Sequence, residues 1–119
     1  MSKTKINNVG TTVAASKTVG EVQAILATHG AKRVAIEYNG MSPCGLSFFI
    51  EVHGHSQEFR LPVRPENVLR RMVHEGLTNR FANPEQAERV AWRQMRDWVR
   101  AQMGLITSGQ TSMEEVFFS

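Results

Sequence analysis

Three short stretches in which apolar and polar residues alternate constrain the fold of this chain more than any other feature of its sequence. Side chains at every second position of a strand point to the same face. The apolar members are Val34, Ile36 and Tyr38 in the first stretch, Leu46, Phe48, Ile50 and Val52 in the second, and Phe59, Leu61 and Val63 in the third. Turn-rich links separate the stretches, so the sequence predicts an antiparallel three-stranded sheet with one apolar face. Pro62 lacks an N–H, which places the third strand at an edge.

An apolar sheet face needs a cover, and the segments before and after the strands are predicted to be helices that supply it. Thr18 and Glu21 have the spacing of a capping box. Apolar residues then recur at helical intervals up to Gly30, a residue suited to ending a helix. These features predict a helix over 18–29.

The second half of the chain is predicted to be mainly helical. A short helix starts at Pro65 and stops at Gly76. A long helix runs over 84–107, with Asn83 as its N-cap. A last short turn begins at Thr111, where the capping-box spacing recurs. The fold class is therefore α+β: a small antiparallel three-stranded sheet packed by an N-terminal helix and a long C-terminal helix.

Length and composition place the chain among single-domain globular proteins. Its 119 residues fit one domain, which we expect over 17–119 after a flexible N-terminal arm over 1–16. The single cysteine, Cys44, excludes an internal disulfide and is typical of a reducing cytoplasm. The sequence has neither a secretory h-region at its start nor an apolar run of about 20 residues, so we expect no membrane partner.

Positive charge is concentrated in arginines on the long predicted helix. Arg89, Arg93, Arg96 and Arg100 are spaced i, i+4, i+7 and i+11, and we call these four residues the arginine face. One interpretation is the solvated back of a helix whose apolar stripe, including Trp92 and Trp98, packs on the sheet. The other is a surface that binds phosphate groups or an acidic protein surface. The net charge of +3 is too small to decide between them.

Three residues outside the arginine face complete the candidate binding set. Arg70 and Arg71 lie on the short helix that starts at Pro65. Phe49 lies on the sheet face opposite Phe48, among polar neighbours, whereas Tyr38 shares the apolar face and is expected in the core. An exposed Phe49 would be a stacking residue for a ligand. A covered Phe49 would mean that helices lie on both faces of the sheet.

No group of residues in the sequence has the pattern of a catalytic or metal site. His53 and His55 are one residue apart, but a metal site needs three or four ligands. Cys44 lacks the surroundings of a known cysteine nucleophile. Glu37 and Glu51 can face each other across strands, but a carboxylate pair works as acid and base only in a pocket that shifts one pKa. We therefore predict no catalytic residues, no metal, no cofactor and no enzymatic activity.

Three segments resemble a family of small proteins encoded by tailed bacteriophages and prophages. They are TVGEVQAILATHGAKRVAIEY, FRLPV and QAERVAWRQMRDWVRAQMGLITSGQTSMEEVFF, and the resemblance covers about residues 17 to 118. The arrangement AWR…W…AQ…EEVF is its most specific part. The resemblance implies a phage protein that acts in the cytoplasm of a bacterial host, and it carries no catalytic residues over to this chain.

Two functions follow as hypotheses. The first is a non-enzymatic accessory protein that binds and modulates a host protein or nucleoprotein complex, as anti-defence and host-takeover inhibitors do. The alternative is a nucleic-acid-binding accessory protein of phage DNA replication or recombination. The C-terminal pair Phe117 and Phe118 either docks on the core or forms a contact in a homodimer.

Overall fold

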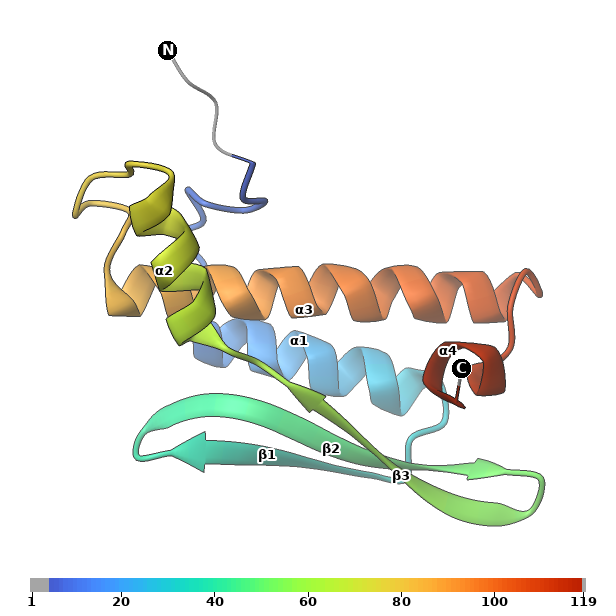
Figure 1. Ribbon diagram of the computed structural model, residues 1–119. Coiled ribbons are helices and arrows are strands. Elements are labelled where there is room, and N and C mark those ends of the chain that lie inside the picture. Colours follow the sequence, from blue (N-terminus) through green and yellow to red (C-terminus); the bar gives the residue numbers. More distant parts are fainter. Residues whose placement is uncertain (1–4, 119) are drawn as a thin grey trace.

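The computed structural model describes residues 5–118, apart from the side chain of Phe118, and confirms the predicted α+β class (Figure 1). Its elements follow in the order α1 (Ala15–Thr28), β1 (Arg33–Asn39), β2 (Ser42–Val52), β3 (His55–Pro62), α2 (Pro65–His74), α3 (Pro84–Thr107) and α4 (Met113–Phe118). Among the described residues, no helix is long and apolar enough to cross a membrane.

The sheet is an antiparallel meander in the order β1-β2-β3. Phe48 of β2 lies opposite Val34 on one side and Phe59 on the other, so apolar residues of the three strands share one face. Glycines with positive φ, Gly40 at 65° and Gly54 at 81°, form the two tight turns. Left-handed backbone of this kind carries little strain at glycine.

All helices lie on one side of the sheet, with α1 and α3 side by side above it (Figure 1). The main hydrophobic cluster joins these two helices to the apolar face of the sheet. A second cluster joins α2 to the first half of α3 around the fully buried Met72. Among the described residues, no helix lies over the opposite face of the sheet (Figure 1).

Trp92 is the largest fully buried side chain. Its indole Nε1 donates a hydrogen bond of 2.9 Å to the carbonyl oxygen of Pro43, at the start of β2. Trp98, one helical turn and a half further on, is 39% exposed and meets Phe117 edge to face, with 6.0 Å between the ring centroids. The expectation that Trp98 is a core residue is therefore wrong, because only the Trp92 side of the apolar stripe faces the sheet.

The prediction that Tyr38 lies in the core is also wrong, because its side chain is 60% exposed. The strand register shifts between Glu37 and Tyr38, so that Tyr38 lies opposite Pro43 near the tip of the β1–β2 hairpin. Strand alternation predicts a face only while the pairing stays regular, and a bulge ends that regularity.

Two helix starts also differ from the prediction. Helix α1 begins at Ala15 rather than at 18, so Thr18 lies inside it and its hydroxyl donates to the carbonyl oxygen of Ala14 at 3.5 Å. The C-terminal capping box is formed by Ser112 and Glu115, one residue later than predicted. Helix α3 has the predicted bounds, and Asn83 caps it by accepting from the Gln86 N–H at 2.9 Å.

The N-terminal segment 5–14 packs against α2 and α3 rather than forming a loose arm, and residues 1–4 of the predicted arm lie outside the described part. The buried Gln86 side chain donates to the carbonyl oxygens of Val9 at 2.9 Å and Thr11 at 2.8 Å. Ile6 and Val9 pack against the second hydrophobic cluster.

At the other end of the chain, Phe117 docks on the core. Its ring centroid lies 5.4 Å from that of Phe48 and 4.8 Å from that of Phe59. Of the two alternatives for the tail, docking on the core is the one observed for Phe117, while the side chain of Phe118 lies outside the described part.

We expect Trp92→Ala to lower the free energy of unfolding by about 3–5 kcal/mol, because it removes a fully buried aromatic ring and leaves a cavity. The matched change Trp98→Ala should cost clearly less, because Trp98 is partly solvated already. Urea unfolding followed by circular dichroism measures both. Equal losses for the two variants would contradict the placement of α3 on the sheet.

Candidate functional site

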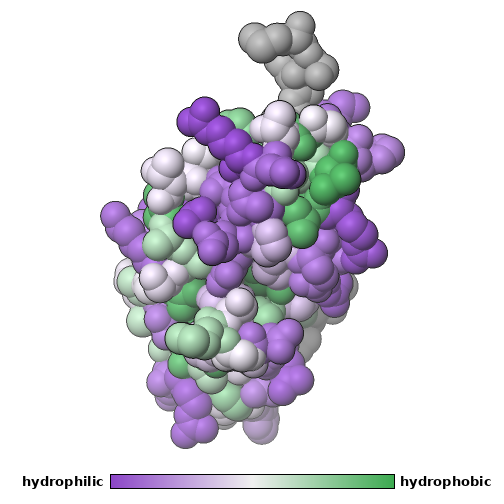
Figure 2. All heavy atoms as spheres, turned by 90° about the vertical axis from the view of Figure 1, so that its left-hand side faces the viewer, coloured by the Kyte–Doolittle hydropathy of each residue, from purple (hydrophilic) through white to green (hydrophobic). Residues whose placement is uncertain are grey.

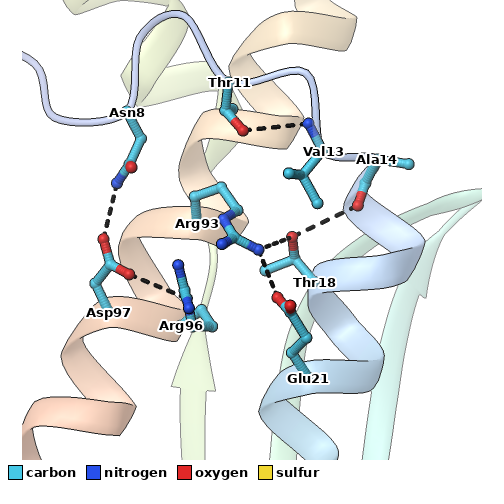
Figure 3. Close-up of polar contacts among 9 residues, drawn as sticks. All are labelled: Asn8, Thr11, Val13, Ala14, Thr18, Glu21, Arg93, Arg96 and Asp97. Carbon is cyan, nitrogen blue, oxygen red and sulfur yellow. Dashed lines mark hydrogen bonds and ion pairs between the residues drawn. The ribbon is translucent and has the colours of Figure 1, made fainter.

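The arginine face does not form one exposed row of guanidinium groups. The side chains of Arg93 and Arg96 are each only 12% exposed. Arg93 Nη1 donates to Glu21 Oε2 at 2.5 Å and to Thr18 Oγ1 at 3.3 Å, both on α1 (Figure 3). Arg93 therefore ties α3 to α1.

Arg96 is held within the fold by a different contact. Its Nε lies 3.0 Å from Asp97 Oδ1, an ion-pair distance, although the angle is not that of a hydrogen bond and this buried Nε has no hydrogen-bond partner. Asp97 also accepts from the Asn8 side chain at 2.9 Å (Figure 3). The carboxylate thus connects Arg96 to the N-terminal segment.

The two ends of the arginine face are more accessible. Arg89 is partly buried and donates to Gln86 Oε1 at 3.1 Å. Arg100 is exposed, and within residues 5–118 no ion pair of its side chain is found. Only Arg89 and Arg100 therefore remain accessible to a ligand from the set of four.

The two arginines of α2 lie on its exposed surface. Arg71 Nε forms an ion pair of 2.9 Å with Glu75 Oε2, one helical turn away. Arg70 donates to the side-chain oxygen of Asn67. The contact of Arg70 is exposed and contributes at most about 1 kcal/mol to stability, so Arg70 can change partners at low cost. Glu75 is only 11% exposed and also accepts from the backbone N–H of Lys5 at 2.9 Å, so it holds Arg71 more firmly.

Phe49 lies on the uncovered face of the sheet and is partly buried there. The guanidinium carbon of Arg33 lies 5.5 Å from its ring centroid, a cation–π distance. Charges of both signs surround it, such as the Lys32–Glu51 pair at 3.0 Å. Phe49 is therefore shielded by an arginine, and this face has no excess of positive charge beside it.

A pocket of about 570 Å³ opens at the end of the molecule that carries the β1–β2 hairpin, and we call it the hairpin pocket. Its walls come from the start of α1, the end of β1, Pro43 and the first turns of α3. Two apolar side chains stand at its rim: Met41, which is 97% exposed, and Tyr38. Figure 2 views this end of the molecule, where patches of apolar surface lie between charged groups.

The rim of the hairpin pocket is acidic. Glu85 and Glu88 of α3 line it together with Arg89. The same two glutamates line an adjoining pocket of about 460 Å³, to which α2 contributes Glu66. Glu66 and Glu85 lie in the first turns of their helices, where a carboxylate is favoured by the helix dipole.

A second concave region lies between α2, α3 and the N-terminal segment, and we call it the Trp98 groove. Two adjacent pockets of about 510 and 320 Å³ form it and share Gln94 and Trp98. Arg71 and Lys5 line the first pocket, and Arg64 lines the second. The groove therefore combines an accessible indole with basic side chains.

Groups suited to catalysis do not gather in either region. In residues 5–118, no three side chains of His, Cys, Asp or Glu lie together as metal ligands would. The thiol of Cys44 lies 3.6 Å from the carbonyl oxygen of Glu37, which accepts its weak hydrogen bond. Glu37 lies opposite Gly45 in the strand pairing rather than opposite Glu51, and its carboxylate lies 3.8 Å from Arg60.

Apart from Arg89, the residues of the hairpin pocket were not part of the predicted site. Met41 lies in the turn-rich link NGMSPCG, and an apolar residue within a tight turn is the one signal that pointed there. The pocket itself combines three segments that are separate in the chain: the start of α1, the β1–β2 hairpin and the first turns of α3. Sequence periodicity identifies the face of each element but not which elements meet.

Comparisons with protein-family models, with curated proteins and with solved structures find no match to this chain. The resemblance to phage proteins and the functions it implies thus stay predictions.

Reversing the charge of Arg93 should destabilise the fold. Arg93→Glu places a carboxylate against Glu21 in a mostly buried position, and we expect a loss of about 2 kcal/mol or more in the free energy of unfolding. The double change Glu21→Arg with Arg93→Glu should recover part of this loss. Arg100→Glu serves as the control and should shift the urea midpoint little, because its side chain is exposed. If Arg93→Glu is as stable as the parent, Arg93 does not hold α1 to α3.

Proposed function

We propose that this protein is a non-enzymatic accessory protein that binds another protein through the hairpin pocket and modulates it. The observation that carries the proposal is the pair of exposed apolar side chains, Met41 and Tyr38, at the rim of a pocket beside the β1–β2 hairpin. Single exposed apolar residues are common on protein surfaces, but apolar residues gathered at a concave site are typical of interaction surfaces.

The charges of the rim favour a particular kind of partner. Glu85, Glu88 and the neighbouring Glu66 outnumber Arg89. A partner surface with an apolar side chain flanked by lysine or arginine residues would complement both the pocket and its rim. Such surfaces occur on proteins that bind nucleic acids, where the basic residues face phosphate groups.

The resemblance to phage-encoded proteins adds the setting of this proposal. In that setting the partner is a host protein, or a protein of a host nucleoprotein complex, in the bacterial cytoplasm. Binding would inhibit or redirect it, as anti-defence and host-takeover proteins do. The resemblance bears only on the cellular setting, by association with other phage proteins. The binding surface rests on the residues of the hairpin pocket.

Nucleic-acid binding is the second candidate, and the Trp98 groove favours it. An accessible indole beside Arg64, Arg71 and Lys5 combines a stacking surface with charges for phosphate. The negative charges of Glu75 and Asp97 in the same groove oppose this function. We therefore place it second, as an accessory role in phage DNA replication or recombination.

Site-specific photocrosslinking in bacterial cells tests the first candidate. A photoreactive residue at Met41 should capture one defined host protein, and the change Glu88→Lys in the same chain should abolish the capture. A photoreactive residue at Val73, which is 62% exposed on α2 and does not line the hairpin pocket, is the control and should not capture that protein. Equal capture from both positions, or none from Met41, would contradict binding through the hairpin pocket.

Binding to labelled single-stranded DNA, duplex DNA and RNA at two salt concentrations separates the two candidates. For the first candidate, we expect no tight binding at low salt. A nucleic-acid-binding protein would lose roughly one log unit of affinity per phosphate contact for each tenfold rise in salt. Tight, salt-sensitive binding that Arg64→Glu abolishes would establish the second candidate and place the ligand in the Trp98 groove.

A further inference from the structure

Strand β1 leaves one edge of the sheet without a strand partner. Within the described residues β1 pairs with β2 alone, because the strand order is β1-β2-β3. Backbone N–H and C=O groups along such an edge can pair with another strand. The other outer strand, β3, ends in Pro62, which cannot donate a hydrogen bond and is typical of edges that stay unpaired.

The sequence of β1 is complementary to itself when two copies run antiparallel. In a pair centred on Ala35, Arg33 of each copy lies opposite Glu37 of the other, and Val34 lies opposite Ile36. A pair centred on Ile36 would instead place Arg33 opposite Asn39 and lose both opposite-charge pairs. Opposite charges that face each other across strands stabilise the pairing, so charge selects the Ala35 register.

The side chains of Arg33 and Glu37 lie where this pairing needs them. Arg33 lies over Phe49, and Glu37 lies 3.8 Å from Arg60, so both are on the face of the sheet that has no helix over it. Glu37 retains 48% of its side-chain exposure. Both groups can therefore reach a neighbouring strand without crossing the core.

Helix α1, which lies above the sheet beside β1, presents a face of small residues. Thr18 and Glu21 face α3, whereas Gly20, Ala24 and Ala27 are exposed. Glycine weakens a helix interior, so its presence at position 20 calls for a reason. A larger side chain would fit there, because no neighbouring side chain or strand lies within 4 Å of the Cβ position of Gly20. Nothing in residues 5–118 requires glycine there, while a second helix approaching closely would.

We propose that the protein forms a two-fold symmetric homodimer in which two β1 strands pair antiparallel about Ala35. The sheet then continues across both copies, and the two α1 helices meet over the junction through their small residues. The same surface patch serves both copies, as in isologous dimers. The pairing also places Lys32 of the second copy opposite Tyr38, at the rim of the hairpin pocket. The dimer does not rest on the proposed function.

Sedimentation equilibrium over a range of protein concentrations tests the dimer. The parent chain should reach the dimer mass, and Arg33→Glu or Glu37→Arg alone should raise the dissociation constant by about tenfold or more, because each places like charges opposite each other twice. The double variant R33E/E37R restores opposite charges and should regain dimerisation. Circular dichroism checks that each variant is folded.

Strand β3 supplies the matched control, because Glu58 and Arg60 lie on the other outer strand. Glu58→Arg should leave the dissociation constant unchanged. A parent chain that stays monomeric, a single β1 variant that dimerises like the parent, or a loss of dimer in Glu58→Arg would each overturn the proposal.

Cysteine crosslinking tests the register directly. In a Cys44→Ser background, Ala35→Cys places two thiols opposite each other at the two-fold axis, and mild oxidation should give a disulfide-linked dimer. Ser56→Cys, exposed on β3, is the control and should stay monomeric. Equal crosslinking of both variants, or none at residue 35, would contradict pairing about Ala35.

Discussion

The burial of Trp92 between α3 and the sheet fixes the position of α3 relative to the β1–β2 hairpin. Its indole N–H bonds to the carbonyl oxygen of Pro43, and Pro43 lines both acidic pockets. Glu88 and Glu85 precede Trp92 by one and two helical turns, so they follow the same side of α3 toward the hairpin. One buried ring thus brings acidic side chains from a helix next to the exposed Met41 of a strand turn.

The arginine face shows what helical spacing can and cannot predict. The spacing correctly groups Arg89, Arg93, Arg96 and Arg100 on one side of α3. Whether that side faces solvent depends on α1, whose Glu21 lies 72 residues away in the chain and is the ion-pair partner of Arg93. The burial of Arg93 beside a partly exposed Glu21 is a property of two elements together, and periodicity describes only one of them.

Most of the fold could be predicted, because three alternating stretches and one amphipathic helix each carry a strong local signal. The predictions that were wrong concern residues whose position depends on tertiary contacts. Tyr38 follows a shift in strand register, and Thr18 contributes to a helix–helix contact rather than to a helix cap. The candidate site could not be predicted in this way. The hairpin pocket exists only where three separate segments meet, and Phe49 is shielded by Arg33 of the neighbouring strand.

The docking of the N-terminal segment has a consequence for how the chain folds during synthesis. Asn8 bonds to Asp97 across 89 residues, and the Gln86 side chain bonds to Thr11 across 75. The ribosome releases residues 5–14 well before their partners on α3, which follow 75 to 89 residues later. The nascent sheet therefore passes through a stage in which Phe48 and Phe59 lack the cover of α3 and are open to chaperones. Residues 5–14 can therefore dock only after α3 has formed, and their contacts then hold the helix layer in place.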